Sequence, residues 1–264
     1  MKNNILVLFI FFAVLALTGC VKQKQGLTLT DGVLTVGVEV GYPPMEYYDT
    51  DGVTLLGFDI ELVNALAQKL GLTVNFIDTA WEGIFAGLET DRYDIAVNIT
   101  ILPERQERFN FTRPYIASSM TIVANKNSNI KIENPLDIAG RRIAYQGDTT
   151  AQYFTERLRG QIRFTSFSYD KITNCFNDLR LRRLDLVAAD NIVAYHYASA
   201  ENSPFHVIWE GPADEYIAIC LKKGNDALTN ALNNALNEMF ADGTMLEISQ
   251  KIFNADLVSS INNL

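Results

Sequence analysis

The chain has 264 residues, of which 48% are hydrophobic, and it carries a formal net charge of −9. This length and composition allow a sizeable buried core in one large domain or two small ones. The negative charge argues against a nucleic-acid partner and against a folded body that lies on anionic lipid, because both interactions need a basic surface.

The first 19 residues predict a signal peptide. Lys2 is the only charged residue before an apolar run at positions 5–17. This run is too short to span a bilayer comfortably, since spanning takes roughly 20 apolar residues. The tetrapeptide Leu17-Thr18-Gly19-Cys20 resembles the lipobox of bacterial lipoproteins, which implies cleavage before Cys20 and lipid on its sulfur and new amino group. The alternative is an uncleaved membrane anchor with an incidental cysteine.

Residues 20–30 are expected to form the lipidated cysteine and a flexible polar linker. Residues 31–118 then alternate between segments of strand character and segments of helix character. Apolar or alternating runs predict strands, and apolar stripes at helical spacing predict helices. The predicted strands are 33–40, 72–76 and 93–99, and the predicted helices are 58–70 and 82–89. Gly71 is expected to end the first of these helices.

The alternation continues through the rest of the chain. The predicted strands are 120–124, 141–145, 164–169, 184–189 and 216–221, and the predicted helices are 150–159, 172–182, 191–200, 226–242 and 244–253. This order predicts an α/β layer structure with a mostly parallel sheet. Two such units on one exported chain indicate two lobes with a cleft between them, which is the usual place for a small ligand.

The cysteine and histidine content limits the chemistry. The chain has three cysteines, none in a CxxC spacing, and two histidines. We therefore expect no metal site, no cofactor and no histidine-dependent nucleophile. Cys175 and Cys220 are expected to be buried thiols, although export would permit a disulfide between them.

Residues 93–105 show the pattern that most clearly indicates a ligand site. A buried strand ends in polar Asn98 and Thr100, and the chain then turns through Pro103 to Arg105. Open α/β sheets bind ligands at the carboxyl ends of their strands. The planar fork of Arg105 suits a carboxylate, because it can donate two parallel hydrogen bonds. The alternative is a surface arginine in a run of charged residues.

Here the sequence resembles a known family. The matching segments, in order, are Gly57-Phe58-Asp59-Ile60-Glu61-Leu62, Trp81-Glu82-Gly83-Ile84-Phe85-Ala86-Gly87-Leu88, Tyr93-Asp94, Pro103-Glu104-Arg105 and Phe111-Thr112-Arg113-Pro114-Tyr115. They resemble the polar amino-acid-binding proteins of ABC importers, called extracellular solute-binding protein family 3. The resemblance covers essentially the whole mature chain.

The resemblance implies a two-lobed periplasmic-binding-protein fold of type II, the Venus-flytrap arrangement. Residues 31–118 and 217–264 would form lobe one and residues 119–216 lobe two, with hinge crossings near 119–124 and 216–221. It implies an exported monomer, periplasmic or on the outer surface and membrane-anchored through Cys20. This protein would bind an α-amino acid, polar and in some members basic, and deliver it to a permease with its ATPase. No reaction is required.

The resemblance also implies roles at the carboxylate end of the ligand. Arg105 matches the arginine that clamps the α-carboxylate, and Thr100 and Asn98 match positions that line the same pocket. Family members usually carry serine or glycine where Asn98 stands. Thr149 and Thr150 match a lobe-two turn whose backbone N–H groups meet the carboxylate, and their alternative role is to cap the helix that follows.

The remaining implied roles concern the ammonium group and the side chain. Asp190 matches the acid that receives the α-ammonium group, and its alternative role is also a helix N-cap. Tyr42 and Trp81 match positions that stack on the ligand side chain, with loop packing and core packing as their respective alternatives. Glu39 matches a frequently acidic position near the side-chain pocket.

Two other functions fit the same resemblance. An enzyme like the cyclohexadienyl dehydratases would need a general acid or base in the cleft, for which Glu39 or Asp190 could serve. An amino-acid sensor would be expected to continue into a transmembrane helix after position 264. A lipid anchor suits uptake better than it suits the enzyme.

We predict that Cys20→Ser releases the protein from the membrane fraction or leaves it unprocessed, because the thiol that takes the lipid is gone. Membrane fractionation and the mass of the mature N-terminus measure this. Processing and membrane association identical to those of the wild type would contradict a lipid anchor at Cys20.

Overall fold

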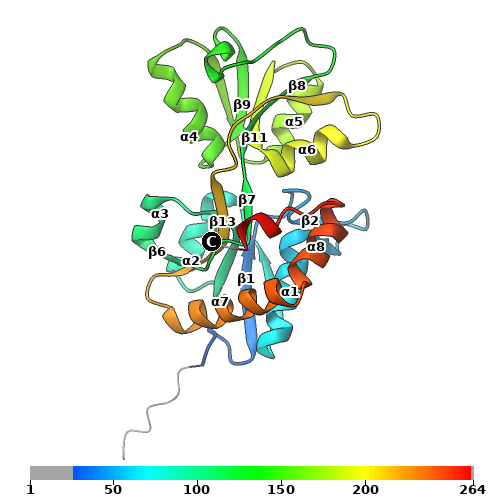
Figure 1. The fold of residues 1–264 in the computed structure, drawn as a ribbon. Helices are drawn as coiled ribbons and strands as arrows, with labels where there is room; N and C mark the ends of the chain where they lie inside the picture. Colours follow the sequence, from blue (N-terminus) through cyan, green and yellow to red (C-terminus); the bar gives the residue numbers. More distant parts are fainter. Residues whose placement is uncertain (1–25, 263–264) are drawn as a thin grey trace, which may run out of the picture.

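The computed structural model describes residues 26–262, which form two lobes joined by extended segments (Figure 1). The predicted signal peptide and Cys20 lie outside the described residues. Within residues 26–262, no helix is both long and apolar enough to cross a membrane. The predicted α/β fold of two lobes is confirmed.

The first lobe is built on a six-stranded sheet. Its main strand order is β4-β1-β5-β13-β6, and β7 also pairs with β13. The strands are β1 (Val33–Val38), β4 (Thr73–Asp78), β5 (Ile95–Thr100), β6 (Phe109–Phe111), β7 (Ile116–Ser118) and β13 (Glu215–Lys222). One face packs on α1 (Phe58–Leu70), α7 (Asp226–Ala241) and α8 (Thr244–Phe253). The other face packs on α2 (Ile84–Glu89). Smaller elements of this lobe are β2 (Tyr47–Tyr48), β3 (Leu55–Leu56), α3 (Pro103–Arg108) and the 3₁₀ turns Trp81–Gly83 and Ser259–Ile261.

The second lobe is built on a five-stranded sheet of order β10-β9-β11-β8-β12. Its strands are β8 (Met120–Asn125), β9 (Arg142–Gln146), β10 (Thr165–Tyr169), β11 (Leu186–Asp190) and β12 (Phe205–Glu210). Its α-helices are α4 (Thr150–Arg157), α5 (Ile172–Arg180) and α6 (Asn191–Ser199), with 3₁₀ turns at Pro135–Ile138 and Leu158–Gly160. Apolar clusters lie on both faces of the sheet, one with residues of α5 and α6 and the other with residues of α4.

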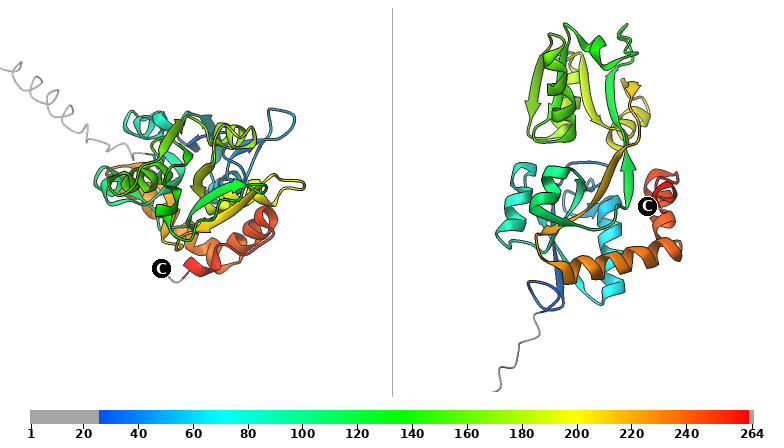
Figure 2. Two further views of the ribbon diagram at one scale, coloured as in Figure 1. Left: turned by 90° about the horizontal axis from the view of Figure 1, so that it is seen from above. Right: turned by 60° about the vertical axis from the view of Figure 1, so that its left-hand side comes forward.

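The chain crosses between the sheets twice. Ser119 separates β7 from β8, and residues 211–214 separate β12 from β13. Both crossings are visible side by side between the lobes (Figure 2). They are shorter than expected, because residues 120–124 and 216–221 are already hydrogen-bonded within the two sheets. The crossing strands β8, β12 and β13 pair antiparallel with their neighbours, whereas β1, β4 and β5 are parallel.

The predicted elements are largely confirmed, and the exceptions have local causes. Gly71 ends α1 in the left-handed conformation, as expected. The short strands β2, β3, β6 and β7 and the one-and-a-half-turn helix α3 were missed, since elements of two to six residues show too little periodicity. The sequence pattern also predicts no element for the segment of β12.

The linker prediction is wrong at its end, because residues 27–30 belong to the folded lobe. Leu27 packs against the apolar core, Thr28 is buried, and the Leu29 N–H donates to Asp94 Oδ1 at 2.6 Å. Cys175 and Cys220 are buried free thiols, as predicted.

A close backbone contact places the loop after β1 against the start of α1. The Phe58 N–H donates to the Pro44 carbonyl at 3.0 Å, and the Asp59 N–H donates to the Met45 carbonyl at 3.1 Å. Gly57 has φ of 132°, and a Cβ there would lie 2.0 Å from the Met45 oxygen. Only glycine permits both that conformation and that approach. The glycine thereby brings the loop that carries Glu46 onto the helix that carries Asp59.

We predict that Gly57→Ala destabilises the protein by more than about 3 kcal/mol, because it adds a backbone clash to an unfavourable φ. Gly52→Ala is the matched control: its φ is 71°, but a Cβ would meet nothing within 4 Å, so its cost is only the conformational one of about 1–2 kcal/mol. Urea unfolding of both variants measures the difference. Equal losses would show that the Met45 contact is unimportant.

Candidate functional site

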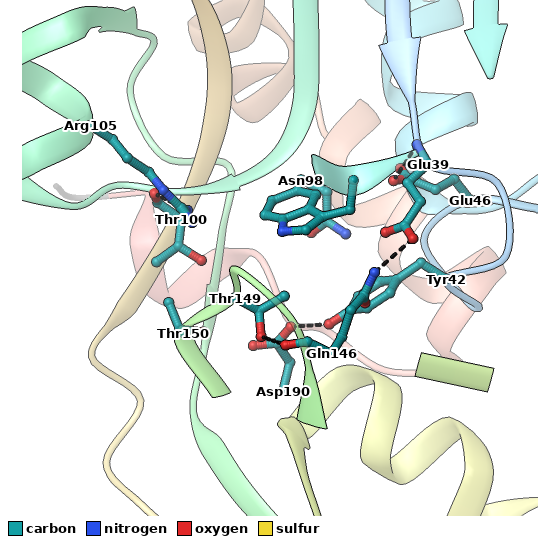
Figure 3. A pocket seen from close by; sticks show the side chains of 11 residues that line it. Glu39, Tyr42, Glu46, Asn98, Thr100, Arg105, Gln146, Thr149, Thr150 and Asp190 are labelled. Atoms are coloured by element: carbon teal, nitrogen blue, oxygen red, sulfur yellow. Dashed lines mark hydrogen bonds between the residues drawn. The ribbon is translucent and has the colours of Figure 1, made fainter. Parts of the chain in front are cut away.

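A cavity between the lobes holds all nine residues that the sequence singled out for ligand binding. Its lining is Glu39, Tyr42, Glu46, Trp81, Asn98, Thr100, Arg105, Gln146, Thr149, Thr150 and Asp190. Arg105 and Thr100 lie at one end, and Glu39 and Glu46 lie at the other (Figure 3). The cavity therefore has a basic end and an acidic end.

Arg105 is buried at the basic end, 7% exposed, and is not a surface residue. It sits in α3 after Pro103, which starts the helix. Its guanidinium donates to the Thr100 carbonyl at 3.2 Å and to the Asp148 carbonyl at 3.3 Å. Its Cζ lies 5.0 Å from the centroid of the Phe85 ring. Burial lowers the pKa of Arg105 from its usual value, and no carboxylate within residues 26–262 forms an ion pair with it.

The turn after β9 faces Arg105 from the second lobe. Thr149 occupies the N-cap position of α4, but its hydroxyl donates to the Gln146 carbonyl at 2.8 Å and does not cap the helix. The Thr150 hydroxyl donates to Glu215 Oε2 at 3.0 Å. The first N–H groups of α4 have no partner within the helix, and the two threonines at this end of the helix line the cavity.

Asp190 also stands at an N-cap position, before α6, yet its side chain caps nothing. Its carboxylate accepts from the Tyr42 hydroxyl at 2.5 Å and from the Ser118 hydroxyl at 3.4 Å. Desolvation raises the pKa of Asp190, against these hydrogen bonds and the attraction of Arg105. The pKa of the neighbouring Glu215 is raised to about 8, first by desolvation and then by the charge of Asp190. Asp190 is thus a carboxylate in the cavity with hydroxyl donors and no cation bonded to it among the described residues.

The acidic end is formed by Glu39, Glu46 and Gln146. Glu39 is 5% exposed and accepts from Gln146 Nε2 at 2.7 Å. Desolvation raises the pKa of Glu39 to about 7, partly offset by the Gln146 hydrogen bond and by Lys171. Gln146 Oε1 and Glu46 Oε2 are buried and accept no hydrogen bond from a donor among the described residues. This end therefore presents acceptors in excess of donors.

Trp81 and Asn98 lie between the two ends. The Trp81 indole N–H donates to the Asp148 carbonyl at 3.1 Å, and its ring packs edge-on against Phe85. The Trp81 side chain is half-buried, so it packs partly against the core and partly lines the cavity. Asn98 has φ of 60° within β5, and its N–H donates to the Tyr115 hydroxyl at 2.8 Å. That conformation turns the strand locally at the cavity wall.

Several of these bonds connect the lobes, so this is a closed arrangement. Glu39–Gln146, Tyr42–Asp190, Trp81–Asp148 and Arg105–Asp148 all join a residue of the first lobe to one of the second. Lys171 adds another, by donating to the Val40 carbonyl at 3.1 Å. Closure brings the two ends of the cavity to their observed spacing.

Sequence reasoning missed Glu46 and Gln146. Gln146 ends a buried strand, so the argument that selected Asp190 would also have selected it. Glu46 gave a weaker indication, a single acid between Met45 and Tyr47 just after two prolines. Among residues 26–262, no group of three or more His, Cys, Asp or Glu side chains is arranged to hold a metal ion.

Comparison with known proteins shows which family this chain belongs to. The model for bacterial extracellular solute-binding proteins, family 3, matches residues 34–255. The L-cystine-binding protein TcyJ of Escherichia coli (strain K12) is 32% identical over 228 residues, covering 86% of this chain and 84% of that protein. An ancestral arginine-binding protein bound to arginine superposes with a TM-score of 0.80 at 32% identity, covering 84% of this chain and 98% of that one. The ancestral amino acid-binding protein AncCDT-1, a precursor of cyclohexadienyl dehydratase, gives 0.76 at 31% identity, over 84% and 95%.

We predict that Glu39 makes the ligand-free protein less stable as the pH rises. The folded protein keeps a proton on Glu39 up to pH about 7, whereas the unfolded chain releases it near 4.5. Stability therefore falls between these values and levels off above them. Glu39→Gln should remove this fall, gaining about 3 kcal/mol relative to wild type across the window.

Urea unfolding of ligand-free protein at several pH values measures the effect. Glu104→Gln, at an exposed position, is the control and should follow the wild-type profile. Parallel profiles for Glu39→Gln and wild type would contradict a protonated Glu39.

Proposed function

Because this chain belongs to the bacterial extracellular solute-binding proteins of family 3, we propose that its cavity binds an α-amino acid for import by an ABC transporter. The basic end takes the α-carboxylate, Asp190 takes the α-ammonium group, and the acidic end takes the side chain. The closed protein then delivers the amino acid to a membrane permease with its ATPase.

The single observation that carries this proposal is the buried, unpaired guanidinium of Arg105. Burying a charge without a counter-charge is costly, so a buried arginine is normally paired. Within residues 26–262 its guanidinium donates to two backbone carbonyls and packs against the Phe85 ring, and no carboxylate forms an ion pair with it. A ligand carboxylate supplies the missing charge, and the N–H groups at the start of α4 add further donors. Thr100 and Asn98 line the wall beside it.

Asp190 supports an amino acid over a simple carboxylic acid. Its carboxylate lies in the same cavity as Arg105 and already accepts from the Tyr42 hydroxyl. An α-ammonium group is a better donor to that carboxylate than a neutral hydroxyl. The pair of opposite charges in one cavity matches the two charges of an α-amino acid.

The acidic end favours a ligand with a polar side chain, and it also accepts a cationic one. Glu39, Glu46 and Gln146 offer acceptors there, and Tyr42 and Trp81 supply ring faces for the side-chain methylenes. The relatives named above bind L-cystine or arginine. Both carry nitrogen groups beyond the first α-ammonium group.

Ligand binding is coupled to lobe movement. We take residues 119–216 to move as one body against residues 31–118 and 217–264, with the flexible points at Ser119 and residues 211–214. Contacts from both lobes to one ligand stabilise the closed form relative to an open one.

We propose a binding protein and not an enzyme. The relatives TcyJ and the arginine-binding protein are named for binding, and AncCDT-1 is itself described as an amino acid-binding protein. Prephenate and arogenate should therefore be stable in its presence. As for location, we propose an exported monomeric lipoprotein, periplasmic or on the outer surface, held to the membrane through Cys20.

We predict that Arg105→Ala weakens amino-acid binding by about 2–5 kcal/mol, because it removes one partner of a buried charge pair. Arg108→Ala is the matched control on the same helix, since Arg108 is exposed and pairs with Glu89; its affinity should equal that of wild type. A thermal-shift screen of the common amino acids finds the ligand, and calorimetry measures Kd. Wild-type affinity in Arg105→Ala would refute the proposed carboxylate site.

A further inference from the structure

Two carboxylic acids lie together at the acidic end of the cavity, and a simple ligand contact does not account for both. Glu46 lines the cavity at 3% exposure, and Asp59, in the first turn of α1, lies behind it with no exposure. The Gly57 contact with the Met45 backbone holds the two elements together. Each carboxyl has one oxygen with a backbone or side-chain donor: Glu39 N–H reaches Glu46 Oε1 at 3.4 Å, and the Tyr115 hydroxyl reaches Asp59 Oδ1 at 2.7 Å.

The other two oxygens, Glu46 Oε2 and Asp59 Oδ2, receive no donor from another group in residues 26–262. The two carboxyls are neighbours, because the Asp59 N–H donates to the carbonyl of Met45, the residue before Glu46, and each carboxyl acts on the pKa of the other. Two ionised carboxylates would both be acceptors only, whereas a proton on one of them supplies the donor that the other lacks. Burial of both acids therefore favours one shared proton and one negative charge on the pair.

The proton belongs on Glu46. Asp59 lies at the positive end of the α1 dipole and accepts from the Tyr115 hydroxyl, and both effects favour its ionised form. Glu46 has only the long contact from the Glu39 backbone to support a charge. Burial raises the pKa of Glu46, and the neighbouring Asp59 raises it further.

The charges around the pair offer nothing to replace that proton. Glu39 lies in front of it, and the charges of Asp78, Glu82 and Lys171 act on Glu39 from neighbouring elements. Lys171 is the only cation among these, and its ammonium is hydrogen-bonded to the Val40 carbonyl. The Gln146 amide oxygen, 2% exposed, is an unpaired acceptor in the same cavity wall. A cation with several N–H donors fits this end.

We propose that the Glu46–Asp59 pair sets the charge selectivity of the site by exchanging its proton for a cationic ligand side chain. With a neutral side chain, the proton stays on the pair. With a cationic side chain, Glu46 ionises, its proton leaves to solvent, and the net charge of this end stays the same. This inference rests on the proposed amino-acid site and adds to it a proton coupled to the side chain.

L-arginine and L-citrulline are the probes that test it, because citrulline replaces the guanidinium by a neutral urea group of similar shape. Both present the same α-ammonium group to Asp190 and Glu215, so their difference reports the side-chain end. Calorimetry at pH 7 in phosphate and in Tris, two buffers of different ionisation enthalpy, counts the protons released. We expect arginine to release about one more proton than citrulline, and its affinity to fall relative to that of citrulline as the pH is lowered toward 5.

The variant Glu46→Gln distinguishes a proton released by the pair from a proton released by a neighbouring acid. Its amide can donate to Asp59 as the protonated acid does, but it cannot ionise. We expect the extra proton to disappear and the arginine-to-citrulline affinity ratio to fall by about tenfold or more. Glu39→Gln removes the proton that Glu39 itself can release, so the extra proton that remains in this variant belongs to the Glu46–Asp59 pair. If Glu46→Gln does not fold, Asp59→Asn makes the same test, since it also abolishes the shared proton.

Three results would overturn the inference. One is arginine binding without extra proton release in wild type. Another is an extra proton that persists in Glu46→Gln and vanishes in Glu39→Gln, which would assign it to Glu39. The third is binding of other amino acids but not arginine. All three leave the amino-acid function standing, whereas a failure of every common amino acid to bind would refute both proposals.

Discussion

Arg105 carries a full positive charge that is almost entirely shielded from water. The residue is 7% exposed, and its guanidinium donates to two carbonyl oxygens and packs against an aromatic ring. Carbonyl dipoles and ring faces offset part of the cost of removing it from water, but not all of it. The rest of the cavity depends on that incomplete compensation. A bound carboxylate would complete the pairing, and the closed lobes would keep water from competing with it.

The rest of the cavity holds buried acids that lack a paired cation, as Arg105 lacks a paired anion. Asp190, Glu39 and Glu46 are acids held away from water, and Tyr42 and Gln146 stand in for the donors that a ligand would bring. These substitutes come from the opposite lobe in both cases. The closed form therefore has hydrogen bonds of its own, and ligand binding exchanges some of them for stronger, charged ones. In the proposed site, such an exchange would favour ligands that carry both an ammonium group and a carboxylate.

The position of the acids reflects packing as much as electrostatics. Gly57 lets the loop after β1 touch the first turn of α1, and so Glu46 meets Asp59 in the core. The motif that begins at Gly57 thus has a physical reason beyond helix formation. Its aspartate, Asp59, is fully buried.

Sequence periodicity determined the α/β class, the two-unit order and most of the long helices, because these depend on local apolar spacing that neighbours in the chain share. The strand end in residues 93–105 points to Asn98, Thr100 and Arg105, and the family resemblance supplies Glu39, Tyr42, Trp81, Thr149, Thr150 and Asp190. Only the tertiary structure excludes the alternative of a helix-capping side chain for Thr149 and Asp190. Thr149 and Asp190 stand at N-cap positions without capping, since donors and acceptors from residues distant in sequence compete for their oxygens. Gln146 and Glu46 became part of the site only through contacts across the lobes and between loop and helix, which no local pattern encodes.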